Sequence, residues 1–248
     1  MLTNSSETDW FISWFDTKYY QLLYRDRDNR EAEDFLNNLL HVLKPPTNSA
    51  ILDLACGRGR HAVFLNSQGY DVTGIDASVN SIAMASEAQN DGLHFAVHDM
   101  RVPFAKEKFD YVFNLFTSFG YFADRGDDRR VLDAVFEALK PNGVFVFDFF
   151  NASKVAQNLV ASEVKVVDGL TFTISREIMD DFVIKTIRFH DQGRAFEFQE
   201  RVRLITKQQM ISSLLETGFD ILAEYGDYKF SPFTAETADR LIIIAKKR

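Results

Sequence analysis

The sequence has almost no cysteine and no segment that could span a membrane. Cys56 is the single cysteine among 248 residues, so an internal disulfide is impossible, as expected in a reducing cytoplasm. No apolar run approaches the roughly 20 residues that a bilayer-spanning helix needs. The first residues also lack the basic start and apolar core of a secretion signal. We therefore expect a soluble cytoplasmic protein, neither secreted nor bound to a membrane.

Basic residues are scarce relative to acidic ones. The chain has 28 Lys and Arg against 36 Asp and Glu, a formal net charge of −8. Affinity for nucleic acid comes mostly from clustered Lys and Arg, so no nucleic-acid partner is expected. The acids and histidines show no paired spacing typical of a metal site, so no metal is expected. Hydrophobic residues make up 46% of the chain, enough for one α/β domain with an insertion.

The most informative segment is an apolar run that opens into a glycine turn, Ile51–Gly59. Its first residues predict a strand buried on both faces, with Asp53 near the end, and a helix is predicted from His61. Gly57 and Gly59 would let a ligand approach the main chain, and such a turn favours positive φ. The helix would present unpaired N–H groups at its start. This order of elements predicts the floor of a nucleotide-type pocket.

Two further apolar runs carry an acid at their ends. The run Val72-Thr73-Gly74-Ile75-Asp76 lies about 20 residues after the turn, where an acid can accept hydrogen bonds from both ribose hydroxyls. The third run is Leu93 to Met100 and contains Asp99. In an open parallel sheet the carboxyl ends of the strands line one crevice. We therefore expect Asp53, Asp76 and Asp99 to converge on one ligand.

At these residues the chain resembles the S-adenosylmethionine-dependent methyltransferases of the class I (Rossmann-like) fold, small-molecule type. The resemblance extends from about Tyr20 to the C-terminus and is carried by three motifs: Asp53-Leu-Ala-Cys-Gly57-Arg-Gly59, Gly74-Ile-Asp76-Ala-Ser78 and His98-Asp99-Met100. Ala55 stands where many members have the first glycine of the turn, and alanine is a common alternative there. The resemblance implies S-adenosyl-L-methionine as cofactor. It also implies a doubly wound α/β fold with a seven-stranded sheet of order 3-2-1-4-5-7-6, the last strand antiparallel.

The resemblance further implies which residues bind the cofactor. In related small-molecule enzymes a tyrosine of the N-terminal helix covers the cofactor, and Tyr20 is the match. The backbone of Leu115 and the side chain of Phe116 are implied to lie beside the cofactor; the alternative is that Phe116 and Phe119 only pack within the loop. The full set is Tyr20, Asp53, Ala55, Gly57, Gly59, Asp76, Ala77, Asp99, Met100, Leu115 and Phe116. No catalytic base is assigned; the conceivable ones are His98, Tyr24, Tyr121 and His190.

An N-terminal helical cap is expected over residues 1–46. Residues 9–24 are rich in aromatic side chains at helical spacing, which predicts one amphipathic helix packed on the core. The functional alternative is that Tyr20 or Tyr24 closes over the cofactor, since a sulfonium can sit against an aromatic face. The charged residues 25–28 predict a solvated bend. A second helix carries its apolar stripe over residues 35–43 and is ended by Pro45-Pro46.

The methyltransferase core is expected over residues 47–155 and 206–248. Asp127 or Asp128 is predicted to cap the helix after the fourth strand. Asp148 and Asn151 follow the fifth strand on the crevice side, where they would either contact substrate or form a turn. After residue 206 a capping box is predicted between Thr206 and Gln209, with Gly218 ending that helix and two further strands following it.

Between these two parts, residues 156–205 predict an inserted antiparallel sheet. Period-two alternation indicates four strands, at Val164–Val167, Leu170–Ile174, Phe182–Phe189 and Phe196–Leu204. The insertion is expected above the carboxyl ends of the main strands, as a lid or as an oligomer contact in a monomer or homodimer. Its arginines would face water or, alternatively, bind an acidic substrate; they are Arg176, Arg188, Arg201 and Arg203.

The predicted activity is transfer of a methyl group, by in-line displacement, to an N, O or S atom of a small molecule. Methyltransferases of this fold that modify nucleic-acid bases usually have Asn or Asp, two prolines and an aromatic residue after strand four. Here Asn114 is followed by Leu115 and Phe116, so the resemblance does not extend to the base-modifying members. The overall layout is similar to that of sugar-amine N-methyltransferases. Two alternatives remain: a non-catalytic S-adenosylmethionine-binding protein, and a nicotinamide-dependent oxidoreductase, in which Asp53 would repel the pyrophosphate.

Overall fold

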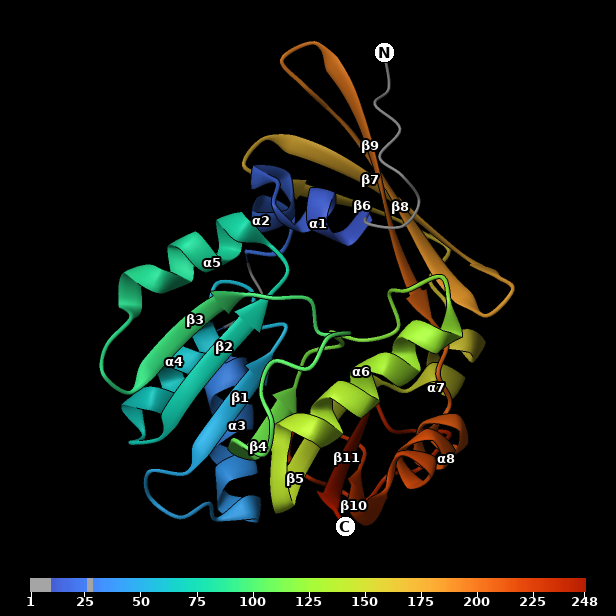
Figure 1. Cartoon of the computed structure of the whole chain (residues 1–248). Helices are drawn as coiled ribbons and strands as arrows, with labels where there is room; N and C mark the ends of the chain where they lie inside the picture. Colours follow the sequence, from blue (N-terminus) through green and yellow to red (C-terminus); the bar gives the residue numbers. More distant parts are fainter. Residues whose placement is uncertain (1–9, 26–28) are drawn as a thin grey trace.

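The main sheet of the protein has seven strands. The computed structural model describes residues 10–25 and 29–248 (Figure 1). The strands of the main sheet are β1 (Ala50–Leu54), β2 (Asp71–Asp76), β3 (Leu93–Val97), β4 (Phe109–Asn114), β5 (Leu139–Phe150), β10 (Phe219–Tyr225) and β11 (Arg240–Lys247). They lie in the order β10-β11-β5-β4-β1-β2-β3. Strand β11 is antiparallel to both neighbours, and the other pairs are parallel. Numbered within this sheet, the order is 3-2-1-4-5-7-6, so the predicted fold is confirmed.

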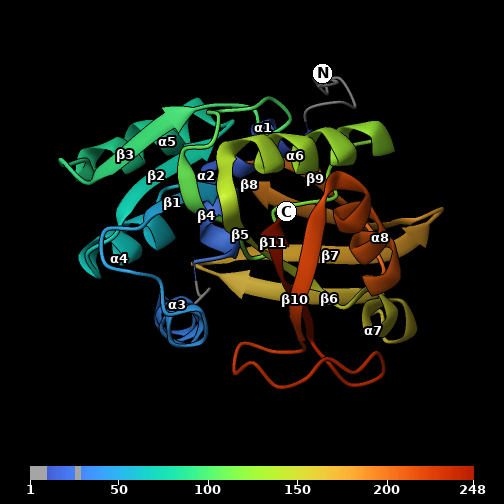
Figure 2. The ribbon, with the colours of Figure 1, turned by 60° about the horizontal axis from the view of Figure 1, so that its bottom comes forward.

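Helices cover both faces of the main sheet, because its strands are apolar on both sides (Figure 2). One face packs against α3 (Asn29–Leu43) and α4 (Arg60–Ser67), and the other against α6 (Arg125–Ala138) and α8 (Lys207–Thr217). Three further short elements are α5 (Val79–Ala85), the 3₁₀ turn η1 (Ser86–Ala88) and α7 (Ala152–Gln157). In the part of the chain that is described, none of the helices combines the length and apolarity that crossing a membrane requires.

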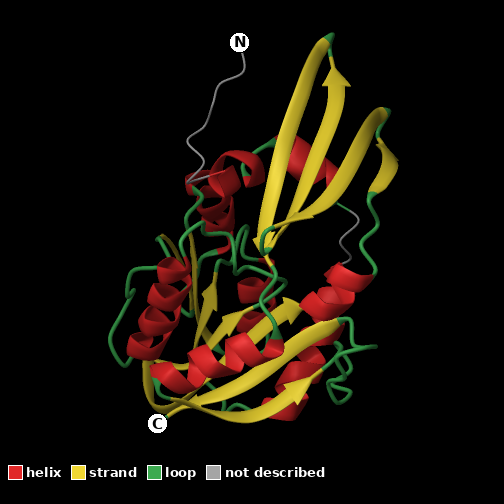
Figure 3. Cartoon of the chain, turned by 90° about the vertical axis from the view of Figure 1, so that its right-hand side faces the viewer, coloured by secondary structure: helices red, strands yellow, loops and turns green. Residues whose placement is uncertain are grey.

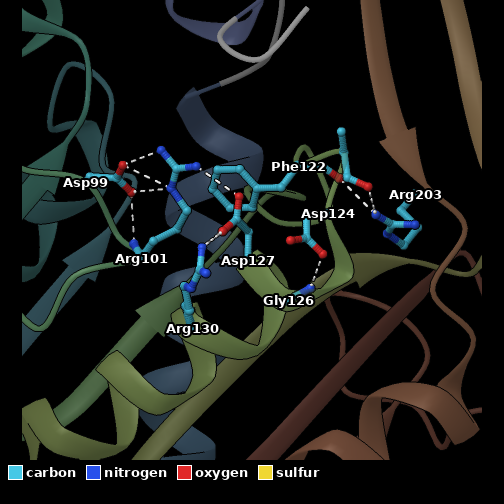
Figure 4. A network of polar contacts seen from close by, with 9 residues as sticks. Asp99, Arg101, Phe122, Asp124, Gly126, Asp127, Arg130 and Arg203 are labelled. Atoms are coloured by element: carbon cyan, nitrogen blue, oxygen red, sulfur yellow. Dashed lines mark hydrogen bonds and ion pairs between the residues drawn. The ribbon is translucent and has the colours of Figure 1, made fainter.

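The ends of two helices test the predicted capping residues. In α8, Thr206 and Gln209 form the predicted capping box, and Gly218 ends the helix in a left-handed conformation. The prediction for α6 is wrong, because its N-cap is Asp124, whose carboxylate accepts the N–H of Gly126 at 2.8 Å (Figure 4). The carboxylate of Asp127 instead binds arginines, as described below.

The aromatic N-terminal segment forms two helices and not the single helix predicted. They are α1 (Trp10–Phe15) and α2 (Lys18–Leu23). The break lies at Thr17, whose hydroxyl donates to the Trp14 carbonyl at 2.8 Å and accepts the N–H of Tyr20 at 3.0 Å. A threonine in this role ends one helix and caps the next. The rest of the predicted cap before Trp10, and three residues of the predicted bend, 26–28, lie outside the described residues.

The inserted segment forms a second sheet of four antiparallel strands, as predicted. These are β6 (Ser162–Val167), β7 (Leu170–Met179), β8 (Phe182–Asp191) and β9 (Arg194–Arg203), paired in chain order. The first hairpin turns at Asp168-Gly169, where both residues have the positive φ that such a tight turn requires. Figures 1 and 3 show this sheet standing beyond the carboxyl ends of β1 and β2.

Helices α1 and α2 pack on the second sheet and share a hydrophobic cluster with it. The ring of Trp14 stacks on Phe198 with centroids 4.4 Å apart, and Tyr19 packs against Phe189 and Phe196. Polar contacts add to this, because Lys165 Nζ donates to the Leu23 carbonyl at 3.0 Å. Helix α3, by contrast, packs on the main sheet. The short helices α1 and α2 therefore lie between the second sheet and the carboxyl ends of the main strands (Figure 1).

Candidate functional site

A cavity of about 570 Å³ lies at the carboxyl ends of β1, β2 and β3; we call it the first cavity. Its volume is in the range of sites that hold cofactor-sized ligands. All the predicted cofactor-binding residues line it except Gly59: they are Tyr20, Asp53, Ala55, Gly57, Asp76, Ala77, Asp99, Met100, Leu115 and Phe116. The structure thus brings together residues that come from α2 and from the ends of four strands.

The two glycines of the turn after β1 have different surroundings. Both have positive φ, +55° at Gly57 and +79° at Gly59. A Cβ placed on Gly57 would meet no atom within 4 Å, whereas one on Gly59 would lie 2.5 Å from Cζ of Phe95. Gly57 therefore leaves main chain open to the first cavity, and Gly59 permits close packing of α4 against Phe95. Ala55 also adopts a left-handed conformation, with φ of +61°.

Asp76, at the end of β2, is held by two main-chain hydrogen bonds. Its Oδ2 accepts the N–H of Gly57 at 2.9 Å, and its Oδ1 accepts the N–H of Ser78 at 2.8 Å. Burial raises the pKa of Asp76, and these two bonds oppose the shift. Each carboxylate oxygen can accept more than one hydrogen bond, so both can also serve a ligand. The bonds fix the carboxylate in place before any ligand arrives.

Asp53, in β1, has a buried carboxylate oxygen without a hydrogen-bond partner among the described residues. The residue is 2% exposed, and the atom concerned is Oδ2. Burial, and secondly the charge of Asp76, raise the pKa of Asp53 to about 7. Buried polar atoms are nearly always hydrogen-bonded, so an orphaned oxygen on a cavity wall indicates that a ligand supplies the donor.

Asp99, after β3, takes part in a chain of charged contacts (Figure 4). Arg101 Nε donates to both of its oxygens at 3.0 Å, and Arg101 Nη1 donates to Asp127, which also pairs with Arg130. Burial alone would raise the pKa of Asp99, but the hydrogen bonds and charge of Arg101 outweigh it and hold that pKa below its usual range. Asp99 is thus an oriented, ionised carboxylate beside the first cavity.

The loop after β4 is held in a strained conformation beside the cavity. Phe116 and Thr117 both have positive φ, +54° and +67°, which non-glycine residues rarely adopt. The buried carboxylate of Asp148 accepts the N–H of Phe116 at 2.7 Å, and its main-chain carbonyl accepts the N–H of Thr117 at 3.1 Å. Asn114 Nδ2 donates to the carbonyls of Leu54 and Ser118. These bonds together define where the Phe116 ring lies.

His61, in α4, stacks on the Phe116 ring with centroids 4.8 Å apart. Burial, and secondly the charge of Arg60, lower the pKa of His61 to about 3. It is therefore neutral near pH 7, and Arg60 Nε donates to its Nε2 at 3.0 Å. The neutral imidazole adds a further flat surface beside Phe116.

A second cavity, of about 810 Å³, adjoins the first. Five side chains line both cavities, and four of them are aromatic: Phe15, Tyr20, Arg60, Phe116 and Tyr121. The second cavity is also lined by Glu200 of β9, Arg240 of β11 and Tyr228. Sequence reasoning missed these three. A signal existed for Arg240, because an antiparallel last strand starts beside the end of β5, and Arg240 pairs with Phe150.

Several other predicted candidates lie outside both cavities. Asp148 binds Arg240 and the Phe116 loop, and Asn151 caps α7 by accepting the N–H of Ser153 at 3.2 Å, so turn chemistry explains Asn151. The four arginines of the second sheet and His190 line neither cavity. Of the other conceivable bases, Tyr24 and His98 line the first cavity and Tyr121 lines both. Within residues 10–25 and 29–248, no group of three or more His, Cys, Asp or Glu side chains is placed to hold a metal ion.

Comparison with known proteins gives a consistent result. Residues 51–143 match the methyltransferase domain family. The chain is 26% identical to the glycine/sarcosine N-methyltransferase of Aphanothece halophytica over 245 residues, which covers 96% of this chain and 89% of the relative.

Two solved structures share the fold. A S-adenosylmethionine-dependent methyltransferase from Clostridium acetobutylicum has a TM-score of 0.78 and 23% identity, covering 92% of this chain and 96% of that one. An amino pentose methyltransferase from Micromonospora echinaspora, CalS10, was solved with S-adenosylmethionine bound. It has a TM-score of 0.72 and 18% identity, and the alignment covers 94% of this chain and 98% of that one. At these identities the likeness of the structures shows the fold alone.

Proposed function

Since the chain is a S-adenosylmethionine-dependent methyltransferase of the class I fold, we propose that it methylates the nitrogen of a small amine. The full-length similarity to a glycine/sarcosine N-methyltransferase supports an amine acceptor. The observation that carries the proposal is the pair of adjoining cavities with a shared aromatic wall. One cavity would hold the cofactor and the other the acceptor.

The first cavity fits S-adenosylmethionine through its acids and its open turn. Asp76 would accept the ribose hydroxyls, because its two oxygens are already oriented by Gly57 and Ser78. The orphaned oxygen of Asp53 would face the cofactor's ammonium group. When bound, the cofactor supplies an electrophilic methyl group on a sulfonium. Tyr20 would lie over it, since aromatic faces attract cations.

The residues of the chain would act mainly by placement. The aromatic side chains of the shared wall exclude water from the space between the two cavities. The Asp148 and Asn114 hydrogen bonds fix the loop that carries Phe116. Correct placement of two reactants can account for about 7–11 kcal/mol of barrier lowering.

The second sheet, together with α1 and α2, would form the lid of both cavities. Phe15 and Tyr20 come from the helices and Glu200 from β9, and all three line the second cavity. The hydrophobic cluster that joins these helices to the sheet would make the lid move as one body. The lid would therefore include two stretches of sequence, one within residues 1–46 and one within residues 156–205.

The direct test is an assay of methyl transfer with S-adenosylmethionine. Amines, alcohols and thiols of low molecular mass are offered in parallel, and S-adenosylhomocysteine and methylated product are measured by mass spectrometry. We expect turnover with amines and not with alcohols or thiols. Binding of S-adenosylhomocysteine without transfer to any acceptor would contradict the proposal and indicate a binding protein. Binding of NADH in place of S-adenosylhomocysteine would indicate an oxidoreductase.

The two turn glycines should respond differently to alanine. Gly57→Ala adds a methyl group toward the open first cavity, so we expect S-adenosylhomocysteine affinity to fall at least tenfold while stability falls by about 1–2 kcal/mol from the positive φ alone. Gly59→Ala forces a methyl group into Phe95, so we expect a stability loss of about 2–4 kcal/mol. Calorimetric titration and chemical denaturation measure the two quantities. Equal stability losses in the two variants would contradict this division of roles.

The raised pKa of Asp53 makes cofactor binding pH-dependent. The ionised carboxylate is the form that attracts an ammonium group, and with a pKa of about 7 the ionised fraction rises about tenfold between pH 6 and pH 8. We expect the association constant for S-adenosylhomocysteine to rise by up to about tenfold over that interval. Asp53→Asn should lose most of this dependence, whereas Asp71→Asn, at the exposed start of β2, should retain it. Isothermal titration of the wild type and both variants at several pH values measures this dependence. An unchanged dependence in Asp53→Asn would contradict the role given to Asp53.

A further inference from the structure

One wall of the second cavity carries two arginines stacked on aromatic rings. The guanidinium of Arg60 lies 4.8 Å from the centre of the Phe116 ring, and that of Arg240 lies 5.3 Å from the centre of the Tyr228 ring. The two rings are themselves in contact, with centroids 5.3 Å apart. The two rings are tilted by 44°, so the cavity has an aromatic wall that carries two guanidinium groups, one of which is paired with Asp148. Guanidinium groups suit a planar or tetrahedral anion.

Arg240 is held in a fixed orientation. Its Nε donates to Asp148 Oδ1 at 2.8 Å, and its Nη2 donates to Thr117 Oγ1 at 3.0 Å. Its side chain is 17% exposed, and Asp148 is fully buried. A guanidinium has five N–H donors in one plane, so a ligand can bind at the edge that faces the cavity while Asp148 keeps the group in place.

The second sheet contributes a carboxylate to the same cavity. Glu200 Oε1 accepts the indole N–H of Trp14 at 2.8 Å and the hydroxyl of Tyr24 at 2.6 Å. Lys185 Nζ lies 3.4 Å from Oε2. Three contacts therefore fix the Glu200 carboxylate, which keeps capacity to accept a further hydrogen bond.

Glu200 lines the second cavity beside residues that line the first. Its hydrogen-bond partner Tyr24 lines the first cavity. The ring of Tyr24 contacts that of Tyr20, with centroids 4.8 Å apart, and Tyr20 lines both cavities. A group bound to Glu200 would therefore be close to the point of methyl transfer.

We propose that the second cavity binds a small amine that also carries an anionic group. The neutral amine donates an N–H to Glu200, which directs the nitrogen lone pair toward the first cavity, and the anionic group binds at Arg60 and Arg240. As the nitrogen takes the methyl group, the methyl–sulfur bond would break, S-adenosylhomocysteine would leave, and the proton shared with Glu200 would depart from the nitrogen. This deepens the proposed function and rests on it. A carboxylate and a phosphate both satisfy this chemistry, so the experiment distinguishes an amino acid from a phosphorylated amino sugar.

The other acids that line the cavity are Glu31, Asp227 and Asp239, and Glu31 is exposed at the start of α3. Asp239 forms an ion pair with Lys154 at 2.6 Å, and Asp227 accepts the main-chain N–H groups of Lys229 and Ser231. The carboxylates of Asp227 and Asp239 are thus engaged by their own neighbours. Among the described acids of this cavity, Glu200 combines burial with a place beside the first cavity.

Matched pairs of acceptors test the charge requirement on the wild-type enzyme. Glycine is compared with glycinamide, and glucosamine 6-phosphate with glucosamine, by kcat/KM for methyl transfer. We expect the anionic member of at least one pair to be preferred by 100-fold or more, and the preferred pair identifies carboxylate or phosphate. Equal or better turnover of the neutral members would overturn the proposal. Absence of transfer to every amine would instead contradict the proposed function itself.

Variants separate the two recognition groups. Arg240→Lys should lower kcat/KM for the anionic acceptor at least tenfold more than for its neutral homologue, because only the anionic acceptor uses the guanidinium directly. Glu200→Gln keeps an oxygen for Trp14 and Tyr24 but loses the charge, and should lower kcat/KM at least tenfold for charged and neutral amines alike. Each variant must bind S-adenosylhomocysteine as the wild type does, which shows an intact first cavity.

Controls come from the same sheet. Glu197→Gln, on the same strand as Glu200, and Arg188→Lys change an exposed ion pair outside both cavities and should leave all kinetic constants unchanged. An equal effect of Arg240→Lys on charged and neutral amines would show a structural role and overturn the anion site. Wild-type activity of Glu200→Gln would overturn the amine site.

Discussion

Replacement of Asp148 by alanine is expected to lower the free energy of unfolding by about 3–5 kcal/mol, the usual effect of removing one partner of a buried ion pair. The change leaves Arg240 without its carboxylate and the N–H of Phe116 without its acceptor. Phe116 then loses the side-chain acceptor that holds its strained conformation, while the bond from the Thr117 N–H to the main-chain carbonyl of residue 148 remains. The midpoint of thermal unfolding should fall by roughly 10 °C. The kcat/KM for methyl transfer should fall by a larger factor than the affinity for S-adenosylhomocysteine.

A surface pair provides the control for Asp148. Asp133→Ala removes an ion pair with Arg129 in which both side chains are more than two-fifths exposed. Such pairs contribute about 0–1 kcal/mol, so we expect nearly unchanged stability. If Asp148→Ala unfolds at the wild-type denaturant concentration, Asp148 does not hold the loop in the way described.

Replacement of Asp76 by alanine is expected to weaken S-adenosylhomocysteine binding by about 100-fold. Two charge-assisted hydrogen bonds to the ribose would be lost, each about 1–2 kcal/mol after competition with water. The N–H groups of Gly57 and Ser78 would also lose their acceptor, so the turn would be less well fixed. Isothermal titration of the folded variant measures the effect.

Asp71→Ala is the matched control for Asp76, because Asp71 lies at the exposed start of the same strand. Its affinity for S-adenosylhomocysteine should equal that of the wild type. Affinity within twofold of wild type in folded Asp76→Ala would remove Asp76 from the ribose role.

The main sheet and the first cavity could be predicted because their signals are local. Each parallel strand is a short apolar run in the sequence. The rule that the carboxyl ends of such strands share one crevice applies to the fold class and does not require the positions of individual side chains. Asp53, Asp76 and Asp99 therefore lie around one cavity, as expected. The capping box of Thr206 and Gln209 is likewise a pattern of neighbouring residues. The cofactor-binding roles of these acids remain predictions.

The second cavity could not be predicted because its residues are assembled by tertiary packing. Glu200 belongs to the inserted sheet, on which α1 and α2 pack through contacts such as Trp14 to Glu200, and these segments are far apart in sequence. The cap of α6 shows the same limit. Asp124, Asp127 and Asp128 all suit an N-cap locally, but Asp127 and Asp128 have distant arginine partners.

The docking of α1 and α2 has a consequence for the order in which the enzyme matures on the ribosome. The two helices have six residues each, too few to be stable alone, and their contacts with the second sheet span 142 to 186 positions of sequence. Their aromatic side chains emerge first, yet the strands that receive them are translated much later. A nascent chain that ends before residue 162 therefore lacks the sheet on which α1 and α2 pack, and the first cavity gains the wall that carries Tyr20 only late in synthesis.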